Sequence, residues 1–282
     1  MYKRQEQYGA ARSRLEPAIE QFDPEALRAW CADLGEATFV GSSGRVFPAS
    51  FRATPLLRAW LRRLANSGVA FAPRHRWIGW GSTPSSTIDP RTARFSLTDG
   101  ATIEVSSDVT VLALGGASWP RVGSDGSWAE TFRRADITVT ELRPANCGVR
   151  VGWSGDFVER FAGVPLKNVS ISVGAATIRG DAMVTTAGLE GGCVYAHSRA
   201  VREAIDADGL CTLRVDLQPD LTTRQLVDRL GRRRPKDSLS STLRRTVGLA
   251  PVALAVLREV SGARLPSDAM GLATLVKSVP VV

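Results

Sequence analysis

Residues 108–128 read DVTVLALGGASWPRVGSDGSW, and this stretch decides how the rest of the chain is interpreted. The short apolar run from Val109 to Leu114 ends in Gly115-Gly116, which is typical of a strand buried on both faces of a parallel sheet. Glycines at the carboxyl end of such a strand let the backbone approach a ligand where a Cβ would collide. In open α/β sheets this edge is where ligands bind.

The turn at residues 123–126 precedes a helix that we predict over Ser127–Arg134. Because the N-terminus of a helix favours anions, this turn is a candidate to face a phosphate or a carboxylate. The alternative is an ordinary strand–loop–helix connection without a ligand, since glycine-rich turns are common.

Length and composition indicate a globular protein. The 282 residues are enough for one or two domains, and a hydrophobic content of 44% with a charged content of 23% is ordinary for a soluble chain. No apolar run approaches the roughly 20 residues that a membrane helix needs, and the N-terminus lacks the pattern of a secretory signal. We expect a cytoplasmic protein with no membrane partner.

The net charge of +8 comes from arginine far more than from lysine. Such a balance is compatible with a nucleic acid or an anionic membrane surface as partner. The densest clusters, residues 232–236 and 244–245, flank predicted helices and carry no RNA-binding signature. We interpret the arginines as solvated helix faces and expect no nucleic-acid partner, with a nucleic-acid-binding protein as a rival that the charge alone suggests.

The cysteines and histidines do not have the spacing of a metal site, so we expect none and expect reduced thiols. His197 lies in a helix predicted over residues 193–204, and we interpret it as a packed or surface residue rather than a proton donor. The chain has no G-x-S-x-G element, which argues against a serine hydrolase. The four cysteines are Cys31, Cys147, Cys193 and Cys211.

Other elements have local signals. Asp23-Pro24 begins a helix that Gly35 ends, and residues 54–66 form an amphipathic helix. A strand and turn are expected at 38–48, with the turn at 41–44. Further strands are expected at 69–73, 76–80, 94–97 and 103–105, with Asp99-Gly100 as a hairpin turn. Beyond Pro144 we expect strands at 147–151, 166–173, 175–184 and 213–217, and helices at 222–230, 239–247 and 252–260.

Three separate motifs resemble those of one protein family and occur in the same order along the chain. They are ALGGASWPRVGSDGSWAETFRRADITVTELRPANCGV at 113–149, GRVFPAS at 44–50, and TTAGLEGGCVYAHS at 185–198. The first is similar to the family's A-T-G-G-x-S-x-P segment with a G-S-T-G-D-G-like turn, and the second to its G-R-V-F-P segment. The third is similar to its G-L-S-G-P-like turn, from which it departs at Glu190 and Gly192. The family is that of the aminoacetone-oxidase-like flavoproteins, bacterial FAD-dependent oxidoreductases, and the similarity spans residue 41 to the C-terminus.

The resemblance implies an α/β fold, namely an incomplete FAD/NAD(P)-binding Rossmann-like domain with an inserted β-rich α+β domain. Residues 1–144 would belong to the FAD-binding domain, residues 145–270 to the inserted substrate-side domain, and residues 271–282 to the start of the return to the FAD-binding domain. The turn at residues 188–192 would either form part of the substrate-side wall or cap a helix.

The resemblance also implies a set of cofactor contacts. The strand end would approach FAD through its backbone, the following turn would be shaped by small residues, and an arginine would lie toward the flavin ring. For that arginine the alternative is a surface position with Phe47 in the core. The residues are Ala113, Leu114, Gly115, Gly116, Ser118, Gly123 and Arg45.

The usual FAD motif of this fold class, G-x-G-x-x-G after a first strand, is missing from the sequence. We therefore expect a fragment of a longer flavoprotein that holds FAD poorly and is inactive. The function implied is electron transfer by FAD between a small organic substrate and NAD(P)H or oxygen. The sequence does not identify a catalytic general acid or base. A non-catalytic or degenerate binding module is the alternative, and the sequence does not determine the oligomeric state.

Overall fold

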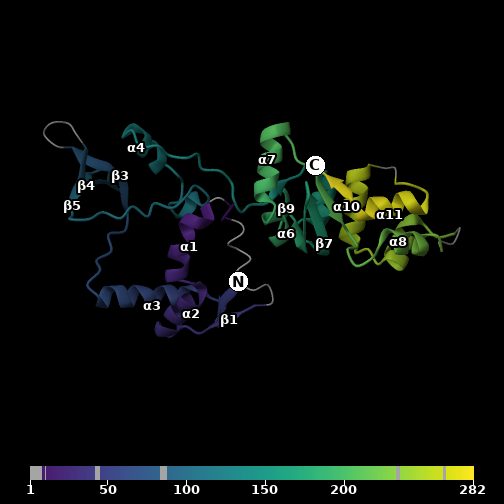
Figure 1. The fold of residues 1–282 in the computed structure, drawn as a ribbon, viewed down its shortest axis with the longest axis horizontal. Coiled ribbons are helices and arrows are strands. Elements are labelled where there is room, and N and C mark those ends of the chain that lie inside the picture. The colour runs from purple at the N-terminus through teal and green to yellow at the C-terminus, as the bar shows by residue number, and fades with distance from the viewer. Residues whose placement is uncertain (1–7, 10, 42–44, 83–87, 233–235, 263–264) are drawn as a thin grey trace. The chain divides into compact units, whose positions relative to one another are not determined.

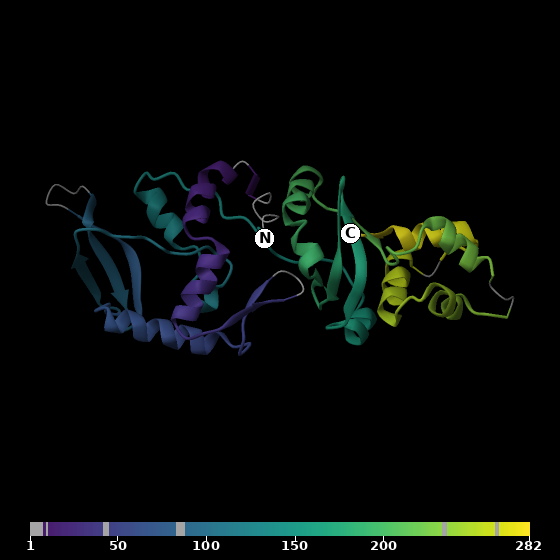
Figure 2. The same ribbon diagram turned by 60° about the horizontal axis from the view of Figure 1, so that its bottom comes forward.

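The structure, a computed structural model, describes residues 8–9, 11–41, 45–82, 88–232, 236–262 and 265–282. The chain divides into two compact units, residues 1–111 and residues 112–282. Figures 1 and 2 show their helices and strands. Every strand pair within the described residues is antiparallel.

The described part of residues 1–111 contains three α-helices, of which the second and third were predicted from sequence and the first was not. They are α1 (Arg12–Gln21), α2 (Pro24–Asp33) and α3 (Ala53–Asn66). The Asp23 carboxylate accepts a hydrogen bond from the backbone N–H of Ala26 at 2.8 Å, so Asp23 caps α2 as predicted. Trp30 of α2 and Trp60 of α3 meet edge to face with ring centroids 5.4 Å apart, so these two helices pack through aromatic residues.

The strands of the same unit form two small sheets. In one, β1 (Thr38–Val40) pairs with β2 (Val46–Pro48); in the other, β3 (His75–Ser82), β4 (Ile88–Leu97) and β5 (Thr102–Ser106) follow one another. The predicted Asp99-Gly100 turn is confirmed, because Gly100 has a φ of +86° and the Asp99 carboxylate accepts from the N–H of Ala101. The strand expected at 69–73 is wrong: the Val69 N–H instead bonds to the carbonyl of Leu64 and closes α3.

Residues 1–111 bury few apolar side chains. The buried ones among the described residues are small, namely Cys31, Ala59 and Ala93, whereas Phe51 and Phe71 are more than half exposed. A stable core needs larger apolar area than these three residues provide. This unit therefore presents apolar surface that nothing within the described part of it covers.

Residues 112–282 contain a six-stranded sheet in the order β11-β10-β7-β8-β9-β6. The predicted strands at 147–151, 166–173, 175–184 and 213–217 are confirmed in type and approximate position. The last strand pairs with β10 at the sheet edge, and its Val279 and Val281 are fully buried. The strands are β6 (Val149–Arg150), β7 (Pro165–Val173), β8 (Ala176–Val184), β9 (Gly188–Glu190), β10 (Leu213–Asp216) and β11 (Val279–Val281).

Helices and connecting segments complete this unit. The single helix predicted at 193–204 is broken into two, because the chain turns at Ala196–His197 and the His197 ring is buried against the sheet. The predicted helices at 222–230, 239–247 and 252–260 are present, the second one ending as a π-helix. The helical elements are η2 (Pro120–Val122), α4 (Trp128–Arg134), α5 (Gly155–Phe161), α6 (Gly192–Tyr195), α7 (Ser198–Asp208), α8 (Thr223–Leu230), α9 (Leu239–Thr242), η3 (Leu243–Val247), α10 (Pro251–Ser261) and α11 (Ala269–Lys277).

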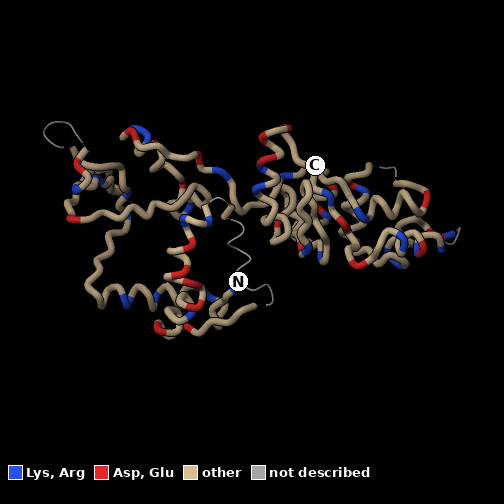
Figure 3. The backbone as a smooth tube through the Cα atoms, viewed as in Figure 1, with Lys and Arg blue, Asp and Glu red and all other residues tan. Residues whose placement is uncertain are grey.

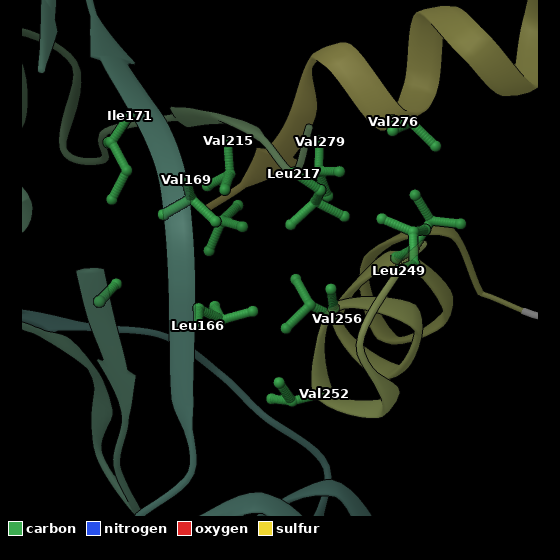
Figure 4. Packing of buried hydrophobic residues seen from close by; sticks show 14 of the residues in the cluster. Leu166, Val169, Ile171, Val215, Leu217, Leu249, Val252, Val256, Val276 and Val279 are labelled. Carbon is green, nitrogen blue, oxygen red and sulfur yellow. The ribbon is translucent and has the colours of Figure 1, made fainter. Parts of the chain in front are cut away.

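The core of residues 112–282 lies between the sheet and its helices. Figure 4 shows Leu166 and Val169 of β7 and Val215 of β10 facing Val256 of α10 and Val276 of α11. All five are at most 1% exposed. Burying a side chain of this size contributes about 1.5–3 kcal/mol, and the cluster is continuous, so it dominates the stability of this unit.

Side-chain hydrogen bonds stabilise a β-bulge in the sheet. β7 has a bulge between Leu166 and Val169, where Asn168 has a φ of +53°. The Asn168 side chain accepts from the Arg179 guanidinium at 2.6 and 2.9 Å and donates to the Asp220 carboxylate at 2.7 Å. Asparagine tolerates this left-handed conformation better than most residues.

The segment that leads into the sheet is held on α7. Arg143 pairs with Asp206, and Arg202 of the same helix donates to the carbonyl of Pro144 at 2.5 Å. The segment before β6 therefore keeps a fixed position on α7. Among the helices of the described residues, none has both the length and the apolar character needed to cross a membrane.

Gly188→Ala should strongly destabilise residues 112–282. Gly188 has a φ of +153°, and a Cβ there would lie 2.0 Å from the carbonyl oxygen of Val149 on the paired strand β6. We expect a loss of about 3 kcal/mol or more in the free energy of unfolding, measured by urea denaturation followed by circular dichroism. Gly192→Ala is the control, because nothing lies within 4 Å of its Cβ and its midpoint should hardly change.

The acid sensitivity of this unit should depend on two carboxylates. The Arg143 guanidinium holds the pKa of Asp206 below its usual value, and hydrogen bonds from Asn168 and Arg179 do the same for the pKa of Asp220. Their contribution is present above the unfolded pKa and is lost as the pH falls through the lowered folded pKa. Between about pH 5 and about pH 3, the urea midpoint should therefore fall less in Asp206→Asn/Asp220→Asn than in the parent.

Asp33→Asn/Asp208→Asn is the matched control for charge, because neither carboxylate has an ion-pair partner among the described residues. Equal pH dependence of the two double variants would contradict the assignment.

Candidate functional site

The glycine doublet lies in an irregular segment and not at the end of a strand. Residues 109–114 form no strand, and the side chains of Val109 and Val111 are 79% and 85% exposed. The prediction of a buried strand at residues 109–114 is therefore wrong. An apolar run becomes a buried strand only when neighbouring strands accept its backbone hydrogen bonds, and no described strand pairs with it.

The doublet is nevertheless held in one conformation. Gly115 has a φ of +70°, and its carbonyl accepts a hydrogen bond from the Trp128 indole N–H at 3.1 Å. Gly126 has a φ of +71°, and a Cβ there would lie 2.8 Å from the Cβ of Ala117. Residue 126 must therefore be glycine for this close packing against Ala117, and residue 115 has a backbone conformation that favours glycine.

Gly116 and Gly123 face open space. A Cβ built on either would meet no atom within 4 Å, so neither glycine is required by packing within this chain. Gly123 has a φ of +91°, which explains its identity by backbone conformation alone. Gly116 has no such conformational reason, and bare backbone at this position is compatible with close approach by a ligand.

The loop after the doublet is closed by backbone hydrogen bonds and carries a shallow hollow. Trp119 and Ser124 exchange two backbone hydrogen bonds of 3.1 and 3.2 Å, which close the loop over η2. Ser118, Trp119, Pro120 and Arg121 line a hollow of about 260 Å³. Pockets that bury a drug-sized ligand usually have about 300–1,000 Å³, so this open hollow does not enclose a dinucleotide.

The turn before α4 does not match an anion site. The predicted helix over Ser127–Arg134 is confirmed as Trp128–Arg134, but the Ser127 side chain does not cap it. The Asp125 carboxylate instead accepts from the N–H of Ser127 at 3.0 Å. A carboxylate placed there repels a phosphate, so we do not assign the cofactor's pyrophosphate to this turn.

The other predicted site residues lie in irregular or exposed backbone. Ala113 is exposed and Leu114 is half-buried in the irregular segment that precedes the doublet. Arg45 is exposed beside β2 in residues 1–111, and its carbonyl accepts from the N–H of Gly41. Its neighbours in the sequence, residues 42–44, lie outside the described residues. The role of Arg45 toward a flavin stays a prediction.

His197 has a structural role. It is 2% exposed, and its Nε2 lies 2.8 Å from the carbonyl oxygen of Ile171 on β7. The interpretation as a packed residue is confirmed. In the segment 188–192, Gly188–Glu190 forms β9 and Gly191 caps α6 with a φ of +119°.

Sequence reasoning missed the residues that hold and line this loop. The Trp128 indole anchors the Gly115 carbonyl, and the Asp125 carboxylate stands at the start of α4. Trp119 and Arg121 line the hollow. A tryptophan after a glycine-rich turn has no local pattern that distinguishes an anchor from a core residue, so the sequence could not have assigned Trp128.

The described residues fit part of FAD and not all of it. Bare backbone at Gly116 suits close approach by a planar group, whereas nothing described around the loop supplies a cradle for the pyrophosphate. We therefore derive no chemical step through the cofactor.

Comparison with protein-family models gives the class of protein. Residues 2–248 match the HI0933-like protein Rossmann domain. The match covers most of the chain, so the chain belongs to this family, a family of FAD-binding Rossmann-domain flavoproteins of the aminoacetone-oxidase-like kind. The predicted family and the α/β Rossmann-like fold class are thereby confirmed, although the described strands themselves pair only in antiparallel order.

Trp128→Phe should loosen the glycine loop without unfolding the protein. The change removes the indole donor to the Gly115 carbonyl and keeps the ring that packs on Phe132. Loss of one such hydrogen bond costs about 1 kcal/mol, which corresponds to about fivefold faster local opening. Hydrogen exchange measured by mass spectrometry should accelerate in peptides covering residues 112–128. Trp119→Phe is the control, since this exposed indole has no hydrogen bond to a described residue and its removal should leave exchange unchanged.

Proposed function

We propose that this chain is part of an FAD-dependent oxidoreductase in which the flavin carries electrons between a small organic substrate and NAD(P)H or oxygen. Membership of an FAD-binding Rossmann family supports this proposal. The observation that assigns this function to particular residues is the open backbone at Gly116, beside a hydrogen-bonded loop with the exposed Trp119. FAD, when bound, supplies the redox chemistry, and the chain's part is to position it.

The proposed contacts to FAD are those of the glycine loop. Residues 113–116 would meet the cofactor through backbone atoms, while Ser118 and Gly123 shape the adjoining turn. Arg45 would lie toward the flavin ring and hold an anionic substrate or the flavin itself. No acid or base is assigned, because the described histidines have other positions: His197 is buried on Ile171, and His75 Nδ1 lies 2.8 Å from the carbonyl of Pro73.

We further propose that residues 1–282 by themselves hold FAD weakly and are inactive. Two observations support this. The sequence contains no G-x-G-x-x-G element, and the apolar segment 109–114 has no strand partner among the described residues. The same observations favour the alternative of a non-catalytic or degenerate binding module.

Flavin content separates the two proposals. The chain should be expressed alone and together with the sequence that flanks it in its reading frame, and each product should be desalted and examined for the visible absorbance of flavin. An oxidoreductase gives a colourless short chain and a yellow longer one. A colourless longer protein that does not take up added FAD would favour the degenerate binding module.

Gly116→Val tests the proposed contact in the longer protein. Nothing within this chain lies near the added side chain, so the variant should fold with an unchanged melting temperature. It should bind FAD at least about tenfold more weakly, which corresponds to about 1.4 kcal/mol. Gly152→Val is the control, because its position is equally open and lies outside the loop. Equal FAD affinity of the two variants would remove Gly116 from the site.

A further inference from the structure

The helices of the two units differ in how much apolar surface they bury, and α3 and α10 show the contrast. Ala59 is the only buried residue of α3. Leu57, Trp60 and Leu61 of the same helix are exposed. α10 buries five of its residues, among them Leu257, which is fully inaccessible to solvent. Because burial of apolar side chains is the main favourable contribution to folding, α3 gains little stability from its surroundings.

The sheets of the N-terminal unit, residues 1–111, show the same deficit. Among the described residues, the three-stranded sheet buries one apolar side chain, Ala93, beside the half-buried Trp77 and Trp80. None of the residues of β1 and β2 is buried. Small sheets are stable only when a further layer covers an apolar face. Neither sheet is therefore stabilised by a core of its own.

The N-terminal unit also carries an unbalanced charge. Residues 45–76 contain seven arginines and no Asp or Glu. Figure 3 shows basic positions recurring along α3. Arg58 and Arg62 are four residues apart and so are neighbours on one side of this helix, where like charges are destabilising. Neither forms an ion pair with a described residue, so nothing described offsets the repulsion.

An anionic dinucleotide has the two properties that this unit lacks. Excess charge of one sign destabilises a compact state through self-repulsion, which a bound anion relieves, and guanidinium groups bind phosphate through paired hydrogen bonds. FAD combines a negatively charged pyrophosphate with planar rings that contact apolar side chains. A second copy of this chain would instead bring the same excess of arginine, so the charge disfavours it.

The apolar run 109–114 links the proposed flavin contact to the N-terminal unit. The division between the two units falls inside the run, between Val111 and Leu112. Val109 and Val111 are exposed, and no described strand pairs with the run. A ligand held on the backbone at Gly116 restricts the run that precedes it, which includes the last residues of the N-terminal unit. A ligand that binds only the ordered form of a protein stabilises that form.

We propose that the helices and sheets of the N-terminal unit are marginally stable in the free chain and become stable when FAD binds, whereas the six-stranded sheet is stable without a ligand. This inference rests on the proposed flavin function, because FAD is the ligand. When the binding-competent form is a minor one, the apparent affinity falls in proportion to its population. The linkage thus gives a physical reason for the weak FAD binding proposed above.

The test is hydrogen exchange of the full chain, measured by mass spectrometry with and without FAD. In the free chain, amides of α3 should exchange at least about a hundredfold faster than amides of the central strand β7. FAD at about ten times its Kd, which equilibrium dialysis provides, should slow exchange in α3 about tenfold and leave β7 unchanged. Inorganic pyrophosphate at the same concentration should slow exchange in α3 less, because it has no rings.

Arg58→Gln/Arg62→Gln tests the contribution of charge. Glutamine has nearly the helix propensity of arginine, so the variant mainly removes repulsion and should slow exchange of α3 in the free chain about twofold. The additional slowing by FAD should become smaller, since less repulsion is left to relieve.

Arg229→Gln/Arg244→Gln is the matched control. These arginines are exposed in residues 112–282, form no ion pair with a described residue, and give the same change in net charge. Exchange of α3 should equal that of the parent, with and without FAD. The same response in both double variants would overturn the role assigned to the arginines of α3.

Three further results would overturn the linkage. They are equal protection of α3 and β7 in the free chain, bound FAD that leaves exchange of α3 unchanged, and slowing by inorganic pyrophosphate that equals the slowing by FAD. Absence of FAD binding to this chain at up to about 1 mM would overturn it as well. The proposed flavin function is judged separately, by the flavin content of the longer protein.

Discussion

The requirement that the backbone groups of a buried strand find hydrogen-bond partners governs this chain. The apolar run 109–114 has the composition of a buried strand, yet it stays irregular with Val109 and Val111 exposed. Residues 112–282 meet the same requirement internally, because β7 lies between β8 and β10. Where lateral partners exist among the described residues, the apolar residues are buried; where they do not, the same kind of sequence stays exposed.

This contrast explains why the two units differ in character. The sheet and helices of residues 112–282 enclose a continuous cluster in which residues such as Ile171 and Val256 are fully buried. Residues 1–111 bury only small side chains within the described part and leave Phe51 and Phe71 exposed. Within the region that matches the family's Rossmann domain, the described strands pair in antiparallel order and the glycine loop is held on Trp128 of α4.

Elements with a complete local signal were predictable from sequence. Asp23-Pro24 begins α2, and Asp99-Gly100 makes the hairpin turn, because each uses only neighbouring residues. Elements that depend on distant partners were not. The 109–114 strand needed neighbours, and the 193–204 helix broke because His197 reaches Ile171 on β7.

The candidate site shows the same division. The glycines at 115 and 126 could be recognised as positions of special backbone, whereas the role of Trp128 as the anchor of the Gly115 carbonyl depends on a contact across 13 residues.

The uneven distribution of aromatic residues has an optical consequence. All seven tryptophans lie at or before Trp153, which packs on Phe157 and donates to the Gly188 carbonyl at 3.1 Å. Emission from this protein therefore samples the N-terminal unit, the glycine loop and one end of the six-stranded sheet. The region from α8 to α11 emits nothing, so its melting is visible only through the ellipticity of its helices.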